Sequence, residues 1–344
     1  MRNPNSAATP EVQSISAGRR GVLGAGIGLA VGAAVGGVRD SLGAGAPAPA
    51  TAAAPVDATP ADAKLLPGFK VQRVKTSGAE LHTVYGGSGP PVLLLHGAPL
   101  THLSWYLVAP ELARKYTVIA PDLRGYGDSS KPEDGKDHIN YSKRAMAQDE
   151  IELMKHFGFD RFAVVGHDRG GRVAHRLALD HPDAVTRMVV MDIVPTHYLY
   201  THVTRAFVDA YFHWFLYIRP APFPENILNG DVEGNFGRNR SPDLRAEYLR
   251  VYHNPAAVHG MCEDYRASAG IDMKFDEEDK NKKIACPLHV LWASDGAMGR
   301  MYDVLKIWKE RGRKVTGAAL TGGHNLQESN PTGVLAQLQP FLAA

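Results

Sequence analysis

Residues 162–171 read Phe-Ala-Val-Val-Gly-His-Asp-Arg-Gly-Gly, an apolar run that passes directly into a glycine-rich turn. The apolar run predicts a buried strand, and the residues from Gly170 onward predict a helix. Glycines around a central residue permit the strained strand-to-helix turn that lifts a nucleophile clear of a sheet. The central residue here is Asp168, so we expect a carboxylate nucleophile. A carboxylate attacks saturated carbon and leaves an ester, which a second step must hydrolyse.

The bulk composition indicates a globular protein with a small-molecule partner. An apolar fraction of 44% in 344 residues is enough for a sizeable core. The 38 basic and 36 acidic residues nearly cancel, which gives no reason to expect nucleic acid or an anionic membrane as partner. The two cysteines, Cys262 and Cys286, are too few for a disulfide framework or a zinc site, and we expect free, buried thiols. No cofactor or metal is predicted.

Residues 1–62 are interpreted as a targeting segment and a linker. The pair Arg19-Arg20 precedes a weakly apolar Gly/Ala run over residues 21–38, and an Ala/Pro-rich tract follows over residues 44–60. This order is typical of a twin-arginine export signal, which predicts a periplasmic or exported protein. The run is too rich in glycine to form a stable membrane span. A low-complexity tail with a chance arginine pair is the alternative.

From residue 63 onward, strand-like and helical stretches alternate, which predicts an α/β fold with a mostly parallel, eight-stranded sheet covered on both faces. We expect a first core segment over 63–194, a helical cap over 195–283 and a second core segment over 284–344. The predicted strands are Val71–Thr76, Glu80–Tyr85, Val92–His96, Thr117–Pro121, Arg161–Gly166, Arg187–Asp192, Leu288–Ala293 and Val315–Leu320. The predicted core helices are Thr101–Arg114, Ser142–Phe157, Gly170–Asp180, Arg300–Arg311 and Pro331–Leu342.

A carboxylate nucleophile needs a base to activate water and an acid to orient that base. His324 follows the last predicted strand in a Gly-Gly-His sequence, so the order nucleophile, acid, histidine is that of the hydrolase triad. Asp192 and Asp295 both stand at ends of predicted strands, and position alone favours neither as the acid.

Two arginines accompany the nucleophile. Arg169 follows Asp168 directly, and Arg172 lies on the first turn of the predicted helix. Guanidinium groups beside a helix N-terminus suit a substrate carboxylate, although a surface ion pair is the plainer alternative for Arg172. The stretch 96–99, His-Gly-Ala-Pro, is expected to supply a backbone donor, and its histidine, His96, is expected to be structural.

Taken together, residues from about Phe69 to the C-terminus resemble the fluoroacetate (haloacetate) dehalogenases of the α/β-hydrolase superfamily. The resemblance rests on motifs in the core and in the cap. They are residues 166–172 (GHDRGGR), 191–196 (MDIVPT), the pair His213-Trp214, residues 261–267 (MCEDYRA) and the terminal Gly323-His324.

The resemblance implies a role for each residue. Asp168 would displace halide from a 2-haloacid while Arg169 and Arg172 hold its carboxylate. The leaving halide would accept hydrogen bonds from His213, Trp214 and Tyr265. Water activated by His324, with Asp192 as the orienting acid, would then release the 2-hydroxy acid.

Three departures from the family pattern predict a wider pocket. Ala98 and Asn325 stand where relatives carry larger residues, and the cap between Asn229 and Glu247 is short. Fluoride is a strongly hydrated, poor leaving group that needs several closely placed donors, so the sequence predicts dehalogenation in general rather than defluorination. An epoxide hydrolase that uses cap tyrosines such as Tyr198, Tyr200 and Tyr211 is the nearest rival, and a non-catalytic ligand-binding protein of the same fold is a second. A homodimer is compatible with the sequence, which does not decide the oligomeric state.

Overall fold

The computed structural model describes residues 58–238 and 241–344. The predicted export signal with Arg19-Arg20 lies outside these residues. In the described part of the chain, no helix is both long and apolar enough to span a bilayer.

The described residues form an eight-stranded sheet in the order β1-β2-β4-β3-β5-β6-β7-β8. The pairs β1–β2 and β2–β4 are antiparallel, and the other five neighbouring pairs are parallel. The predicted mostly parallel α/β fold is thus confirmed. The strands are β1 Lys70–Lys75, β2 Glu80–Gly87, β3 Pro91–Leu95, β4 Thr117–Pro121, β5 Phe162–His167, β6 Val185–Met191, β7 Leu288–Ala293 and β8 Val315–Leu320.

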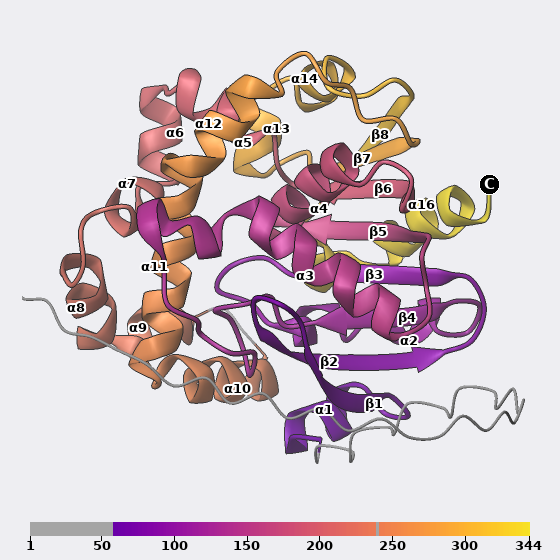
Figure 1. Cartoon of the computed structure of the whole chain (residues 1–344), viewed down its shortest axis with the longest axis horizontal. Coiled ribbons are helices and arrows are strands. Elements are labelled where there is room, and N and C mark those ends of the chain that lie inside the picture. Colours follow the sequence, from indigo (N-terminus) through magenta and orange to yellow (C-terminus); the bar gives the residue numbers. More distant parts are fainter. Residues whose placement is uncertain (1–57, 239–240) are drawn as a thin grey trace, which may run out of the picture. The chain divides into compact units, whose positions relative to one another are not determined.

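Helices cover both faces of the sheet because its central strands are apolar on both sides (Figure 1). In β3, Leu93 and Leu95 pack into the core on one face, and Val92 and Leu94 pack into the core on the other. The first core includes residues of α3 Lys143–His156 and α4 Asp168–Asp180. The second includes residues of α2 Ala109–Leu112 and α16 Pro331–Ala343.

Two predicted core helices are each split in the structure. The expected helix over Thr101–Arg114 is a 3₁₀ turn, η1 His102–Trp105, followed by α2, because Pro110 fits only the first turn of a helix. The expected helix over Arg300–Arg311 is α13 Ala297–Met301 and α14 Val304–Lys309. Asp303 caps the second of these by accepting a hydrogen bond from the Lys306 N–H at 3.1 Å.

Between β6 and β7 the described chain forms helices without a strand, and several of them lie beyond the carboxyl ends of the parallel strands, at the left of Figure 1. We call this helical segment the cap; its predicted limits, 195 and 283, stay a prediction. Its helices are α5 Thr196–Thr201, α6 Arg205–Ala210, α7 His213–Tyr217, α8 Phe223–Gly230, α9 Val232–Phe236, α10 Pro242–Tyr252, α11 Pro255–Ala269 and α12 Ile271–Glu278. The short elements α1 Pro60–Leu65, η2 Lys136–Tyr141 and α15 Leu326–Ser329 complete the described fold.

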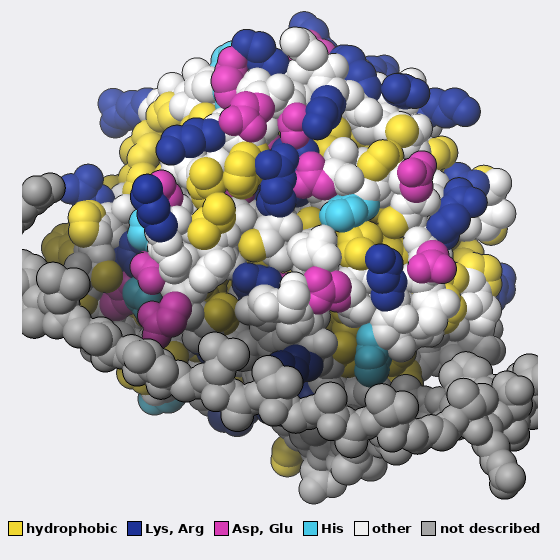
Figure 2. Space-filling model, viewed as in Figure 1, with side chains coloured by type: hydrophobic (Ala, Val, Ile, Leu, Met, Phe, Trp, Pro, Cys, Tyr) yellow, Lys and Arg dark blue, Asp and Glu magenta, His cyan; other side chains and the backbone are white. Residues whose placement is uncertain are grey.

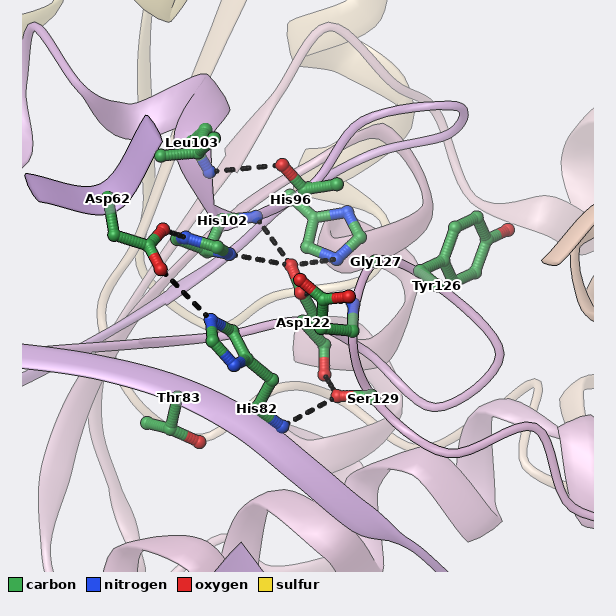
Figure 3. Close-up of polar contacts among 12 residues, drawn as sticks. Asp62, His82, Thr83, His96, His102, Leu103, Asp122, Tyr126, Gly127 and Ser129 are labelled. Atoms are coloured by element: carbon green, nitrogen blue, oxygen red, sulfur yellow. Dashed lines mark hydrogen bonds and ion pairs between the residues drawn. The ribbon is translucent and has the colours of Figure 1, made fainter. Parts of the chain in front are cut away.

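A buried polar network fastens α1 to the core (Figure 3). The two ring nitrogens of His102 lie 2.7 Å from Asp62 Oδ1 and 2.8 Å from Asp122 Oδ1. Burial alone would lower the pKa of His102, but the two carboxylates raise it to about 10. The imidazolium therefore links α1 to the end of β4 at neutral pH.

On the face shown in Figure 2, basic and acidic side chains are interspersed, as the near-zero net charge suggests. Both cysteines are free, as expected. Cys262 is buried, but Cys286 is only partly buried, which corrects the prediction of two buried thiols.

Replacement of Gly170 by alanine is expected to destabilise the fold next to Asp168. A Cβ atom there would stand 2.4 Å from the Leu95 carbonyl oxygen and 2.5 Å from the His96 carbonyl oxygen, so β3 and α4 would have to separate. We expect Gly170→Ala to lower the free energy of unfolding in urea by about 1–3 kcal/mol. Gly230→Ala is the control, because its Cβ would meet no atom within 4 Å. Equal stability of the two variants would contradict this account.

Candidate active site

Asp168 stands at the turn between β5 and α4 with a left-handed backbone, φ +45°. This conformation is costly for a residue with a side chain. The turn is possible because its neighbours are small: a Cβ on Gly166 would lie 2.5 Å from the Gly170 carbonyl oxygen. Gly97 approaches from β3, and a Cβ there would lie 2.7 Å from Asp168 Cβ. The predicted elbow is therefore present, with the carboxylate at its tip.

His324 pairs with Asp192 and not with Asp295. Its Nδ1 lies 2.6 Å from Asp192 Oδ2, and the Ala293 N–H donates to the other carboxylate oxygen at 2.9 Å. Asp192 also has a left-handed backbone, φ +52°, at the end of β6. Asp295 is exposed and accepts a hydrogen bond from the Gly322 N–H at 3.1 Å. Of the two candidate acids, the structure brings only Asp192 to the histidine.

The charges of the site keep Asp168 ionised. Burial alone would raise the pKa of Asp168, but His324, His167 and the two arginines outweigh burial and hold this pKa below its usual value. Burial would lower the pKa of His324, yet its hydrogen bond to Asp192 and the charges of Asp192 and Asp168 raise it above the usual value. An ionised carboxylate thus faces a histidine of increased basicity.

A small cavity of about 210 Å³ lies in front of Asp168 and His324. Core residues form one wall and cap residues form the rest. Its lining is Ala98, Pro99, Asp168, Tyr211, His213, Trp214, Tyr217, Asn235, Met261, Tyr265 and His324.

The stretch 96–99 contributes a backbone donor at this cavity. The Ala98 N–H donates to Asp168 Oδ2 at 3.1 Å. His96 is buried, its Nε2 accepts from the Leu123 N–H at 3.0 Å, and its Nδ1 lies 2.8 Å from the Gly97 carbonyl oxygen. His96 therefore fixes the loop, as the structural interpretation of this histidine expects.

His213, Trp214 and Tyr265 converge from α7 and α11. The Tyr265 ring centre lies 5.8 Å from that of His213 and 5.7 Å from that of Trp214. Burial lowers the pKa of His213 to about 4, so its ring is neutral at neutral pH. A neutral imidazole, an indole and a phenol provide hydrogen-bond donors without a formal positive charge.

Arg169 and Arg172 are buried beside these rings rather than on the cavity wall. Arg169 binds Asp264, while Arg172 Nη1 donates to the Val194 carbonyl oxygen at 3.1 Å and to Thr196 Oγ1 at 2.9 Å. Both guanidinium groups stack on Trp214, at 5.4 Å and 4.6 Å from the ring centre. Arg169 Nη1 and Arg172 Nε are buried and have no hydrogen-bond partner among the described residues. Two donor nitrogens are thus unsatisfied, and a ligand in the cavity can reach them only when the side chains of the cavity wall move.

Several lining residues escaped the sequence analysis. Tyr217 and Asn235 carried no motif that pointed to a site, and Pro99 belongs to the stretch 96–99, from which only a backbone donor was expected. Met261 stands in the stretch 261–267 used for the family resemblance, where only Tyr265 received a role. The spacing of Met261 and Tyr265 by one helical turn was the available signal, because residues four apart share a helix face.

Groups of His, Asp and Glu side chains that are close enough to share a metal ion occur elsewhere in the described chain. None of them contains a residue of the cavity wall. One group is Asp62, His82 and His102 of Figure 3, where His102 instead holds a proton between carboxylates; the others are His82–Asp122–Asp128, Asp134–His138–Glu263 and Glu225–His259–Glu263. In the last group, Arg266 already forms ion pairs with both glutamates.

Comparisons with known proteins agree with this geometry. A family model described as alpha/beta hydrolase fold matches residues 90–229. The chain is 42% identical to a fluoroacetate dehalogenase from a Burkholderia species, over 80% of this chain and 94% of the relative. It is 32% identical to a soluble epoxide hydrolase from a Corynebacterium species, over 78% of this chain and 95% of the relative.

A solved structure gives the same result. ALR0039 from Nostoc sp. PCC 7120, described as an alpha/beta hydrolase, superposes with a TM-score of 0.77 at 46% identity, over 80% of this chain and 98% of that one. Sequence and fold therefore agree over most of the described chain. The protein belongs to the α/β-hydrolase fold family, among the relatives that include fluoroacetate dehalogenase and epoxide hydrolases.

Proposed function

We propose that this hydrolase is a dehalogenase that converts 2-haloacids, such as haloacetate, into 2-hydroxy acids and halide. One observation carries the proposal: an ionised elbow carboxylate faces a cavity whose wall carries His213, Trp214 and Tyr265, and two buried arginine N–H groups nearby have no partner. A nucleophile, donors for a leaving anion and donors for a carboxylate are the three elements that haloacid hydrolysis requires. The family of the chain supports the same chemistry.

In the first step, an Asp168 oxygen attacks the α-carbon, and the carbon–halogen bond breaks with its electron pair on the halide. The product is an Asp168 ester of the 2-hydroxy acid. When the side chains of the cavity wall move to admit the substrate, the unsatisfied N–H groups of Arg169 and Arg172 bind its carboxylate, which fixes the α-carbon in front of the nucleophile. The low pKa of Asp168 keeps it in the attacking form at neutral pH.

The halide acquires its charge only as the bond breaks, so donors aimed at it stabilise the transition state more than the substrate. His213, Trp214 and Tyr265 are those donors. Because burial keeps His213 neutral, it offers one N–H and no full charge. This matters for release, since a cation at this position would hold the halide more tightly.

In the second step, His324 removes a proton from water, and the resulting hydroxide attacks the ester carbonyl carbon of Asp168. The Ala98 N–H, which already contacts Oδ2, donates to the oxyanion that forms. Asp192 orients His324 and stabilises the imidazolium. Collapse of the intermediate expels the hydroxy-acid oxygen, which takes the proton held by His324, and the Asp168 carboxyl group releases the second water proton as it ionises again.

Ester formation itself prepares His324 for the second step. In the free enzyme, the negative charge of Asp168 contributes to the raised pKa of His324. The ester is neutral, so this contribution disappears and the pKa of His324 falls. The fraction of neutral, base-competent histidine therefore rises when the ester has formed.

The cavity volume of about 210 Å³ favours a small substrate, since drug-sized ligands occupy pockets of roughly 300–1,000 Å³. This volume does not support the wider pocket predicted from the sequence: Ala98 lines the cavity, but Asn325 does not. Epoxide hydrolysis is the second candidate, because Tyr211, Tyr217 and Tyr265 line the cavity and could donate to an epoxide oxygen. Tyr198 and Tyr200 do not line it. An epoxide carries no carboxylate, so it leaves the two free arginine N–H groups unused, which makes a haloacid the better substrate.

The defining measurement is release of halide and hydroxy acid from fluoroacetate, chloroacetate and 2-chloropropionate. We expect release from chloroacetate, with Asp168→Asn slower by more than about 10³-fold because the nucleophile is lost. Styrene oxide is the comparison substrate. Diol formation from styrene oxide, with no halide from any acid, would overturn the proposed dehalogenase function in favour of epoxide hydrolysis.

The orienting acid is tested by paired substitutions. Asp192→Asn is expected to slow ester hydrolysis by roughly 10²- to 10⁴-fold, because His324 loses its orientation and the stabilisation of its charge. Mass spectrometry after mixing with chloroacetate should then detect the covalent ester. Asp295→Asn is the matched control and is expected to stay within about twofold of the wild type, since Asp295 is exposed. Accumulation of the ester in Asp295→Asn alone would reverse the assignment.

The electrostatic coupling of Asp168 and His324 predicts a pKa change without turnover. In Asp168→Asn the negative charge that raises the pKa of His324 is gone, so the ring should titrate at lower pH than in the wild type. NMR titration of ¹⁵N-labelled histidine measures this directly. An unchanged or higher pKa of His324 would show that Asp168 does not act on the base.

A further inference from the structure

One residue of the cap binds Arg169 along an edge of its guanidinium group. Asp264, on α11, accepts from Arg169 Nε at 2.9 Å through Oδ2 and from Arg169 Nη2 at 2.8 Å through Oδ1. The backbone carbonyl oxygen of Asp264 accepts a third bond from Nη2 at 3.0 Å. Two parallel bonds from one carboxylate fix both the position and the rotation of a guanidinium.

Tyr265, the next residue on α11, packs against the flat face of this guanidinium. The central carbon of the Arg169 guanidinium lies 4.1 Å from the ring centre of Tyr265. Ser268, one turn further along α11, accepts a hydrogen bond from Nη2. Helix α11 thus supplies an edge contact and a face contact to an arginine that belongs to the nucleophile elbow.

These contacts use the Nε and Nη2 side of Arg169 and leave Nη1 without a partner among the described residues. Arg169 and Asp264 are both fully buried, so Nη1 cannot turn to bulk water. A buried donor without a partner destabilises the folded protein, and a bound anion would remove this cost. The arrangement leaves the guanidinium one free edge for a ligand.

We propose that Asp264 is a positioning residue that orients Arg169 toward the substrate carboxylate and so makes the site selective for anionic substrates. This inference rests on the proposed function.

Asp264 belongs to a buried network that binds it from the core side as well. Tyr126 donates its hydroxyl to Asp264 Oδ2 at 2.6 Å, and Lys143 Nζ pairs with Oδ1. Lys143 also lies 3.9 Å from Asp272, a buried carboxylate on α12. Asp272 makes no direct hydrogen bond or ion pair with Arg169, but it accepts a hydrogen bond from the Ser268 hydroxyl at 3.3 Å, and Ser268 in turn contacts Arg169. Asp272→Asn therefore makes the same chemical change in the same network at a residue whose contact to Arg169 is only indirect.

The test compares Asp264→Asn with Asp272→Asn. For chloroacetate, we expect Asp264→Asn to raise KM and to lower kcat/KM by about 10- to 100-fold, the usual effect of losing a residue that orients a site ligand. Asp272→Asn is expected to keep the KM of the wild type. In an Asp168→Asn background, calorimetry should show weaker chloroacetate binding with Asp264→Asn and unchanged binding with Asp272→Asn.

A loss of folding is separated from a loss of orientation by two further measurements. Far-UV circular dichroism reports whether Asp264→Asn is folded, and its spectrum should match that of the wild type. If Asp264→Asn does not fold, the double variant Lys143→Met with Asp264→Asn removes the unpaired lysine and takes its place. The double variant is then compared with Lys143→Met alone, and its KM for chloroacetate should be higher.

The outcomes distinguish the inference from the function on which it rests. If the wild type releases no halide from chloroacetate, the proposed function fails. If the wild type does release halide, and Asp264→Asn retains its KM and its chloroacetate affinity, the function stands and the positioning role of Asp264 is overturned. Equal losses in Asp264→Asn and Asp272→Asn would also overturn it, because they would show a general effect of the buried network.

Discussion

The site depends on a left-handed backbone at Asp168, between β5 and α4. A residue with a side chain at φ +45° is strained by about 1–3 kcal/mol, and surrounding structure must hold it there. Gly166 and Gly97 allow the sheet, the helix and the neighbouring loop to close on the turn without a clash. Asp192 has the same left-handed backbone conformation at the end of β6, with φ +52°. Both carboxylates thus leave the sheet at the edge where the cap meets the core.

Burial of so many charges is tolerable because most of them are compensated within the site. Asp168 lies among His324, His167 and the two arginines, which lower its pKa in spite of burial. Arg169 is neutralised by Asp264 across the boundary between core and cap. Removing one member of such a set leaves the others unpaired in a medium of low dielectric constant, which is why cap and elbow form one electrostatic unit.

Much of the architecture was predictable because strands and helices follow from local patterns of apolar and polar residues. Apolar runs such as 91–95 and 288–293 predicted the strands to within a few residues. The elbow was predictable for the same reason, since glycine, strand and helix follow each other in ten residues. Two helices were predicted too long, because the apolar spacing continued through Pro110 and Asp303. A proline and an N-cap residue both start a new helix, so the backbone helix is interrupted before each of them.

The sequence by itself determined the α/β architecture, the elbow carboxylate and the order of nucleophile, acid and histidine, because these depend on neighbours along the chain. Only the tertiary structure decided that Asp192, rather than Asp295, meets His324, since both stand at strand ends and the choice depends on where each end lies in the sheet. It also decided that Arg169 is held by Asp264. That contact joins residues 95 positions apart, and no local pattern encodes which distant carboxylate will be buried against a given arginine.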